Sequence, residues 1–246
     1  MNSSKETFLS IIIPAYNEEK RIPLTLKKIS EFLKTKDFLY EIIIIDDGSQ
    51  DATSKIVEEF SKDKYNELRL IRLDKNYGKG FAVRKGILVS RGEYILFTDA
   101  DLSTPIEELD KLLFFIKNGY DIVIGSRGLK QSQLIRRQVW YREKMGKIFN
   151  LLVRILILKG IKDTQCGFKI FKTEVAKKIF LKTKINRFAF DVEVLFIAKK
   201  FNYKIKEVAI TWKNRYASKV HIIKDSIIML MDILRIFIYN LLGHYK

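Results

Sequence analysis

The sequence has few of the features that assign a protein to a class at once. It contains one cysteine, two histidines and no apolar run of the roughly 20 residues that a membrane-spanning helix needs. With Cys166 alone, no internal disulfide can form, which is typical of a reducing compartment. His221 and His244 have no partners at zinc-ligand spacing. These absences exclude a disulfide-stapled secreted module and give no indication of a zinc site.

The N-terminus also lacks the parts of a secretory signal. Residues 1–13, MNSSKETFLSIII, have no basic start, no separate apolar segment and no A-x-A site. No internal repeat and no low-complexity segment is recognisable. We therefore expect a cytoplasmic protein of one domain, or of one domain with an elaborated edge, which 246 residues fit.

What the sequence does have is an excess of positive charge, concentrated in its second half. The formal net charge is +17. Residues 1–126 carry 19 Lys and Arg against 21 Asp and Glu, residues 127–219 carry 24 against 6, and residues 220–246 carry 3 against 2. A basic field of this size predicts an anionic partner, such as nucleic acid, a phosphorylated ligand or an anionic membrane surface.

Short apolar runs alternate with helical patterns through the first half. This alternation predicts an α/β fold with a mostly parallel sheet and helices on both faces. We expect strands at 9–13, 41–45, 68–73, 93–98 and 121–124, and helices at 18–35, 51–62, 79–90 and 105–117. After a basic and apolar stretch at 133–158, we expect helices at 173–181 and 190–201 and a strand at 205–210.

The predicted strand at 93–98 ends in T-D-A-D-L, which supplies two carboxylates, Asp99 and Asp101. Open α/β sheets bind their ligands at the carboxyl ends of the strands. Carboxylate oxygens suit a hard divalent cation that also holds a diphosphate. Because D-x-D is common by chance, its weight comes from the loops that accompany it.

Three other predicted strand ends carry polar groups. In I-P-A-Y-N-E, Tyr16 offers a flat face to a nucleobase, although an ordinary turn explains this segment as well. In I-D-D-G-S-Q-D, the carboxylates of Asp46 and Asp47 suit a base or a ribose hydroxyl, and the residues after them suit helix capping. In N-Y-G-K-G, two glycines flank Lys79 at a helix start, as a diphosphate cradle requires. Together the four ends predict a nucleotide-diphosphate and metal site that is neither a P-loop nor a dinucleotide fingerprint.

These four segments, in this order, resemble the nucleotide-sugar domain of the inverting family-2 glycosyltransferases of GT-A fold. Segments of the second half are similar to one branch of that family, the polyprenyl-phosphate sugar transferases: G-S-R, D-T-Q-C-G-F-K and R-F-A-F-D-V-E. Within this branch the dolichyl-phosphate glucosyltransferases are most similar, and the mannosyltransferases next. The resemblance covers residues 8–220. It implies inverting, metal-dependent transfer of a hexose from a nucleotide diphosphate sugar to a polyprenyl or dolichyl phosphate.

The resemblance also implies roles for individual residues. Asp99 and Asp101 would hold Mg²⁺ or Mn²⁺ on the donor diphosphate. The expected donor-binding residues are Pro14, Tyr16, Glu18, Asp46, Asp47, Lys79, Asp99 and Ala100. The expected acceptor-phosphate residues are Ser126, Arg127, Arg137, Arg215 and Lys219. Asp191 and Glu193 lie where other members place a catalytic base, and helix capping or holding Arg187 in place is the alternative. The expected catalytic set is Asp99, Asp101, Arg127 and Asp191.

Two positions depart from the family pattern. Ser103 stands where mannosyltransferase-type members often have Gln as a further metal ligand, so a water would take that place. Ala217 stands where Gly usually precedes Ser-Lys, which leaves the role of Arg215 open. Cys166 and Phe168, by contrast, are expected to be buried packing residues.

These features divide the chain into three parts: a nucleotide-sugar half at 1–126, an acceptor-binding basic half of the same catalytic domain at 127–219, and an amphipathic C-terminal helix at 220–246. Charged residues interrupt this last apolar segment, and each central charge costs about 2.5–3.5 kcal/mol on insertion scales. We expect an interfacial helix in which positions 225, 232, 235 and 239 form one polar stripe. Packing on the core is the alternative.

The sequence leaves three alternatives open. The donor is UDP-glucose or GDP-mannose, with glucose and UDP favoured, since no residue reads the base or the sugar epimer decisively. The acceptor could be a soluble or cell-envelope glycan. A basic nucleic-acid-binding protein is the third, disfavoured because the basic segment is interleaved with aliphatic runs and carries no nucleic-acid motif. We therefore expect no nucleic-acid partner and a peripheral association with the membrane.

Overall fold

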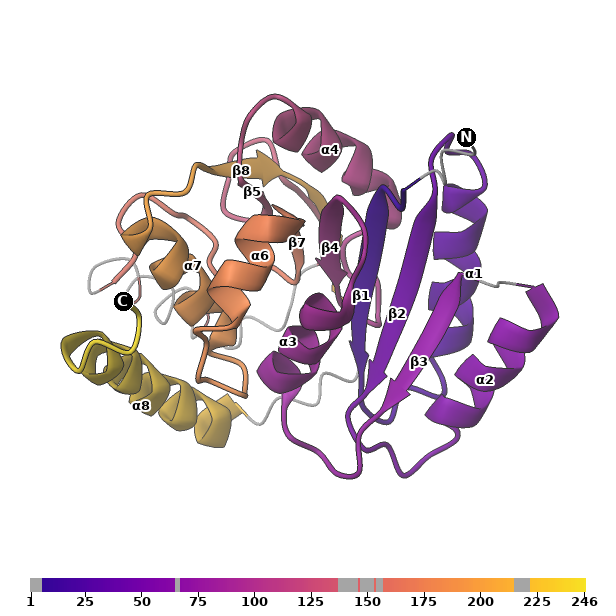
Figure 1. The fold of residues 1–246 in the computed structure, drawn as a ribbon, viewed down its shortest axis with the longest axis horizontal. Coiled ribbons are helices and arrows are strands. Elements are labelled where there is room, and N and C mark those ends of the chain that lie inside the picture. The colour runs from indigo at the N-terminus through magenta and orange to yellow at the C-terminus, as the bar shows by residue number, and fades with distance from the viewer. Residues whose placement is uncertain (1–5, 65–66, 137–145, 147–152, 154–156, 215–221) are drawn as a thin grey trace.

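A seven-stranded sheet with helices on both faces organises the part of the chain that the structure describes (Figure 1). The computed structural model describes residues 6–64, 67–136, 146, 153, 157–214 and 222–246. The strand order is β3-β2-β1-β4-β7-β5-β8, and β7 alone among these seven runs antiparallel to its neighbours. The strands are β1 (Leu9–Ala15), β2 (Tyr40–Asp46), β3 (Leu68–Arg72), β4 (Tyr94–Thr98), β5 (Ile122–Ser126), β7 (Phe168–Lys172) and β8 (Ile205–Ala209).

The helices divide between the two faces of this sheet. One face is covered by α1 (Ile22–Leu33), α2 (Thr53–Lys64), the 3-10 turn η1 (Ile106–Glu108) and α4 (Leu109–Lys117). The other is covered by α3 (Lys79–Val89), α6 (Thr173–Phe180), α7 (Phe190–Lys200) and α8 (Ile222–Leu241). Successive residues of β1 enter opposite cores, because Ile11 and Ile13 face the first set and Ile12 the second. The continuous apolar strands of the sequence are therefore strands buried on both faces.

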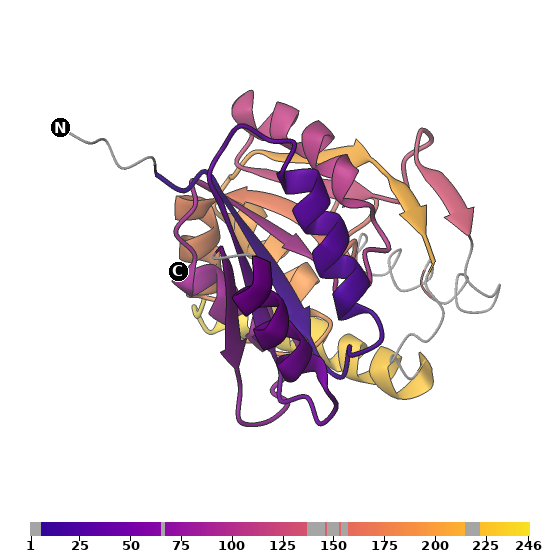
Figure 2. The same ribbon diagram turned by 90° about the vertical axis from the view of Figure 1, so that its right-hand side faces the viewer.

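A small second sheet pairs β6 (Gln133–Arg136) in parallel with β9 (Thr211–Lys213). In the turned view of Figure 2, these two strands lie beside each other beyond the edge of the main sheet.

The α/β fold class is confirmed, and most predicted elements are present. The helix expected at 18–35 begins only at Ile22, and the one expected at 105–117 is divided into η1 and α4. Three strands were not predicted: β6, β7 and β9. The second half of the chain completes the sheet of the first, since β7 lies between β4 and β5. The domain boundaries at 126 and 219 stay predictions.

Helix α8 packs one side on the core and exposes an apolar face. Ile233 and Ile236 are buried, whereas the exposed residues recur at helical spacing: Ile227, Leu230, Met231, Leu234, Phe237, Ile238, Leu241 and Leu242. The predicted polar stripe is wrong, because Asp232 is buried and Tyr239 packs against the core. Core packing, the alternative, is thus present together with an outward apolar face. Across the described residues, no helix combines the length and apolarity needed to cross a membrane.

Candidate active site

Four loops meet at the carboxyl edge of the sheet, where the strand order reverses between β1 and β4, the place where open α/β sheets bind ligands. The loops after β1 and β2 are joined through Asn17. Its N–H donates to Ser49 Oγ and its Oδ1 accepts the N–H of Gln50, each at 2.8 Å. Asn17 has a φ of 53°, a left-handed conformation that asparagine tolerates better than most residues.

Asp47 joins the second loop to the third. Its carboxylate accepts the N–H groups of Tyr77 and Gly78, each at 2.8 Å. Burial raises the pKa of Asp47, and these two bonds counteract part of that rise. The neighbouring Asp46 is fully buried and accepts the N–H of Ser49 at 2.9 Å. Both carboxylates hold loops in place, which does not favour the predicted direct contacts with the donor.

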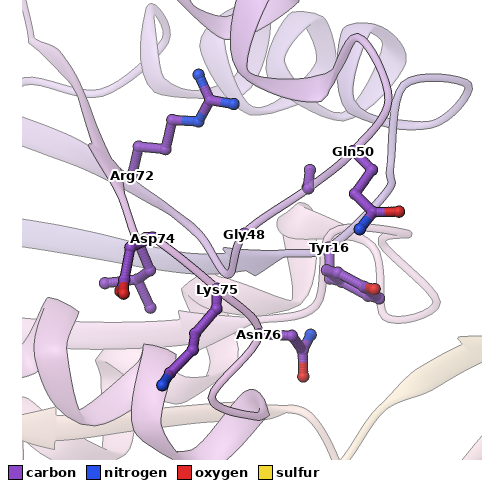
Figure 3. A pocket seen from close by; sticks show the side chains of 9 residues that line it. Tyr16, Gly48, Gln50, Arg72, Asp74, Lys75 and Asn76 are labelled. Carbon is purple, nitrogen blue, oxygen red and sulfur yellow. The ribbon is translucent and has the colours of Figure 1, made fainter.

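A pocket of about 570 Å³ lies beside these loops (Figure 3). Tyr16 and Gln50 line it from the loops after β1 and β2, and Arg72 and Asp74 line it from the end of β3. Gly48 forms its floor with a φ of 72°, where a Cβ would lie 2.5 Å from the backbone of Lys75. The volume of the pocket is typical of small-molecule sites, and the ring of Tyr16 offers a flat face.

The other predicted donor residues border the same edge of the sheet. Pro14 is half-buried at the end of β1. The carboxylate of Glu18 binds the Arg21 guanidinium at 2.5 and 2.6 Å. Ala100 is buried, and its carbonyl accepts the hydroxyl of Thr25 at 2.6 Å. The donor contacts of all three stay predictions.

The D-x-D carboxylates follow β4 directly, and both residues are partly exposed. The side chain of Asp99 is 34% exposed, and its Oδ1 lies 2.6 Å from Lys79 Nζ. Burial raises the pKa of Asp101, while its Oδ1 accepts the N–H of Ser103 at 2.8 Å. Burial acts to lower the pKa of Lys79, but the attraction of Asp99, Asp191 and Asp101 outweighs it and holds the pKa above its ordinary value. The ammonium group is therefore charged.

The residues present fit a divalent cation. Asp99 already binds a cation, the ammonium of Lys79, and Asp99 and Asp101 offer the hard oxygens that Mg²⁺ and Mn²⁺ prefer. Gly167 makes room for this carboxylate, since a Cβ there would lie 2.0 Å from Asp99 Oδ2. Among the described residues, no group of three or more His, Cys, Asp or Glu could hold a metal. Further ligands would have to come from Ser103, water or a bound diphosphate.

Two ion pairs with buried carboxylates lie near the D-x-D. Lys169, whose side chain is 1% exposed, binds the carboxylate of Asp191 and donates to the carbonyl of Cys166 at 2.6 Å. Burial raises the pKa of Asp191, and Lys169 counteracts part of that rise. Arg127 binds Asp163 through Nε and Nη2 at 2.7 and 2.9 Å. Burial acts to raise the pKa of Asp163, but Arg127 outweighs it and holds the pKa below its ordinary value.

Of the predicted acceptor residues, the structure describes Ser126 and Arg127. Ser126 is fully buried at the end of β5, which does not favour contact with a phosphate. Arg127 keeps part of its side chain exposed and lies over the ring of Trp212 at 5.5 Å, although Asp163 already binds its guanidinium. Three further predicted residues lie outside the described residues: Arg137, Arg215 and Lys219.

Sequence reasoning assigned no role to several residues of this site. Lys169, Asp163 and Gly167 belong to D-T-Q-C-G-F-K, a segment that carried only the family resemblance. The sequence feature that pointed to Lys169 is a lysine inside the apolar run F-K-I-F. Arg72 and Asp74 stand at the end of a predicted strand, so their place at the ligand-binding edge was the signal for them. Cys166 and Phe168 are buried packing residues, as predicted.

A mostly parallel sheet with one antiparallel strand, and a D-x-D that follows β4 at the carboxyl edge of that sheet, define the class: a protein of GT-A fold. The glucosyl-3-phosphoglycerate synthase of Mycobacterium tuberculosis, solved with Mn²⁺, UDP and glucosyl-3-phosphoglycerate, has this fold. Its TM-score is 0.68 at 17% identity, over 94% of this chain and 80% of that one.

The Glycosyl transferase family 2 model matches residues 10–180, and the chain belongs to that family. It is 43% identical to a dolichyl-phosphate beta-glucosyltransferase of Dictyostelium discoideum, over 100% of this chain and 78% of that protein. It is 41% identical to the human protein of the same description, over 86% of this chain and 69% of that protein. The resemblance seen in the sequence motifs is confirmed.

Proposed function

We propose that this protein transfers glucose from UDP-glucose to dolichyl phosphate, or a related polyprenyl phosphate, with inversion at the anomeric carbon. The observation that carries the sugar and the acceptor is the identity of 43% over the whole chain with a dolichyl-phosphate beta-glucosyltransferase. UDP is proposed from the similarity of the motifs to the glucosyltransferases, because neighbours of the same fold hold either UDP with Mn²⁺ or GDP-mannose with Mn²⁺. GDP-mannose is the alternative donor.

The donor would lie across the linked loops. The pocket lined by Tyr16 and Arg72 has the size for the base and ribose. From there the diphosphate would reach Lys79 at the start of α3, where a helix N-terminus favours an anion. Asp99 and Asp101 would hold Mg²⁺ or Mn²⁺ on the same phosphates. Such an ion supplies Lewis-acid stabilisation of the charge on the leaving diphosphate.

The transfer needs little help from a base. A phosphate oxygen of the acceptor forms the new bond to the anomeric carbon as the bond from that carbon to the nucleoside diphosphate breaks. A phosphate monoester is already anionic near pH 7, so no proton has to be removed first. This agrees with Asp191, whose carboxylate is buried and bound by Lys169. We therefore assign Asp191 a positioning role in the site.

Repulsion between acceptor phosphate and donor diphosphate has to be overcome by fixed cations. Arg127 is the described residue in this role, with its guanidinium aligned by Asp163 and part of its surface exposed. Arg137, Arg215 and Lys219 are proposed to complete the acceptor site from their positions in the family motifs.

A lipid acceptor requires the protein to work at a membrane surface, which we propose is the cytoplasmic face. The exposed apolar face of α8 supports this, because an interfacial helix buries such a face among the lipids. Lysines border it, since Lys200 Nζ donates to Asn240 at 2.6 Å and Lys182 binds the carbonyl of Lys246. Cations in this position suit an anionic leaflet.

The test is sugar transfer to a short polyprenyl phosphate from radiolabelled UDP-glucose or GDP-mannose, with Mn²⁺ or with EDTA. We expect a glucolipid from UDP-glucose with Mn²⁺ and none with EDTA. Asp101→Asn should abolish transfer, while Asp110→Asn, an exposed aspartate of α4, should leave it unchanged. A mannolipid formed from GDP-mannose, without any glucolipid, would mean that GDP-mannose is the donor. Hydrolysis of the donor without any glycolipid would contradict the proposed acceptor.

A further inference from the structure

Lys79 is the cation that Asp99 binds in this structure. Their Nζ and Oδ1 atoms lie 2.6 Å apart, and the two side chains are 25% and 34% exposed. The pair is thus a contact at the open surface of the site and not part of the packed core. A ligand can reach both partners.

The other described cations near the D-x-D have carboxylates of their own, including Arg21, whose charge acts on Asp101 and which is bound by Glu18. Lys169 is bound to Asp191, and Arg127 is held on two sides by Asp163. Among these four cations, Lys79 is the one bound to a carboxylate of the D-x-D. Within the part of the chain that the structure describes, removing it would leave Asp99 and Asp101 as two neighbouring carboxylates without a bound cation.

Lys79 Nζ and a divalent cation would compete for the same oxygen. At contact distance two cations repel each other strongly wherever water is partly excluded. The described residues also offer no third acidic, histidine or cysteine ligand to complete a metal site. The free protein is therefore poorly suited to hold a metal at the D-x-D.

A diphosphate would remove both obstacles. Its oxygens supply the missing metal ligands, and its charge offers the ammonium of Lys79 a new partner. Lys79 is the first residue of α3, after Gly78 with a φ of 104°, so it stands where a helix start favours phosphate.

We propose that Lys79 is the resident counter-ion of Asp99 and exchanges this carboxylate for the donor diphosphate, so that the D-x-D binds a divalent cation only together with a nucleoside diphosphate. This inference rests on the nucleotide-sugar donor proposed above. It makes Lys79 a positioning residue that sets the order of binding.

The experiment is a titration of Mn²⁺ followed by electron paramagnetic resonance of the free ion, on the full chain with and without UDP. The variants are Lys79→Met, Lys79→Arg and the control Lys85→Met, which removes the same charge from an exposed position of α3. In the native protein, UDP should tighten Mn²⁺ binding at least about tenfold beyond the Mn²⁺–UDP complex in solution. In Lys79→Met without UDP, Mn²⁺ should bind about tenfold more tightly than in the native protein, because the competing cation is gone.

Lys85→Met should behave like the native protein, and Lys79→Arg, which keeps a cation beside Asp99, should gain no Mn²⁺ affinity without UDP. Circular dichroism checks that each variant is folded. The inference is overturned if Lys79→Met binds Mn²⁺ no more tightly than the native protein, or if UDP leaves the native Mn²⁺ affinity unchanged. Calorimetry with UDP and GDP distinguishes a failure of the proposed donor from a failure of the proposed exchange. If neither nucleotide binds with Mn²⁺ present, the proposed donor fails, and the exchange fails with it. Normal nucleotide binding with unaltered Mn²⁺ affinity in Lys79→Met contradicts the exchange alone.

Discussion

The hydroxyl of Tyr245 donates a 2.6 Å hydrogen bond to Oε1 of Glu193, and both side chains are fully buried. Glu193 also accepts the N–H groups of Lys184 and Ile185, at 2.8 and 2.9 Å. A buried carboxylate therefore fastens the segment after α8 to the loop between α6 and α7.

That loop supports the helix that carries Lys79. The carbonyl of Asn186 accepts the N–H of Phe81 at 3.1 Å. Arg84 donates to the side chain of Asn186 and to the carbonyl of Thr183, each at 2.9 Å. The C-terminal tyrosine is thus linked, through one loop, to the start of α3 and the proposed diphosphate position.

Replacing Tyr245 by Phe should lower the free energy of unfolding by about 1.5–3 kcal/mol, the range for hydrogen bonds to charged groups. Urea unfolding measures it, with Tyr203→Phe, a half-buried tyrosine elsewhere, as the control. Burial raises the pKa of Glu193 and the Tyr245 bond counteracts part of that rise. Without this bond the folded-state pKa of Glu193 rises further above its unfolded value. The loss of stability in Tyr245→Phe should therefore grow as the pH increases from the folded-state pKa of the native protein to that of the variant. Equal stability of Tyr245→Phe and the native protein would contradict this role.

Lys169→Met should be among the more damaging single changes, because it leaves Asp191 buried without its partner. Breaking a buried ion pair on one side costs about 3–5 kcal/mol. The double variant Lys169→Met/Asp191→Asn removes the stranded charge and should recover most of the stability. Lys172→Met is the matched control on the same strand, since its pair with Asp121 is partly exposed and worth about 0–1 kcal/mol. Unfolding curves in which the two single lysine variants coincide would rule out the proposed cost.

Gly167→Ala should impair transfer more than folding. The added methyl group would lie 2.0 Å from Asp99 Oδ2, so the carboxylate or the strand has to move. We expect sugar transfer to fall at least about a hundredfold, since misplacing reacting groups by about 1 Å has this effect. Gly146→Ala is the control, because a Cβ there meets no atom of the described residues within 4 Å. Activity within twofold of the native protein would mean that this close approach does not matter.

The predicted and observed structures agree where local patterns decide. The strands β1, β2 and β4 are continuous apolar runs, so their position and their polar carboxyl ends could be predicted from the sequence alone. The strand β7 could not, because Lys169 interrupts its apolar pattern. The structure explains the lysine: it faces the α7 side of the sheet and is neutralised by Asp191, 22 residues later in the chain.

The same limit applies to the candidate site. Asp99 and Asp101 were predicted because a strand end is a local feature. The partners of the charged residues were not, since Lys79 meets Asp99 and Arg127 meets Asp163 only after the sheet has formed. Asp47 was expected to face the donor, and its use by two backbone N–H groups of another loop is likewise a property of the fold.

Cys166 should be chemically silent in the folded protein. It is buried beside the D-x-D, and burial raises the pKa of its thiol to about 12. At pH 8 the thiolate, which is the reactive form, is therefore scarce. Iodoacetamide should label it only as fast as the protein unfolds, and at once in guanidinium chloride, as mass spectrometry would record. Fast labelling of the native protein would contradict the burial of this thiol.

The apolar face of α8 should decide binding to membranes. Leu234 lies in the middle of that face with 57% of its surface exposed, so replacing it removes little packing inside the protein. A glutamate there removes about 1.5–3 kcal/mol of apolar burial in the lipid and adds repulsion from anionic head groups. Leu234→Glu should therefore reduce flotation with anionic vesicles at least about tenfold.

Leu24→Glu is the matched control, because Leu24 is 52% exposed on α1, which covers the opposite face of the sheet. It should float like the native protein. Both variants should have the same midpoint of denaturant unfolding as the native protein. If Leu234→Glu floats as well as Leu24→Glu, α8 is not the membrane surface. Sedimentation then tests the remaining occupant of such a face, a second copy of the chain, since a dimer formed through α8 would dissociate in Leu234→Glu and persist in Leu24→Glu.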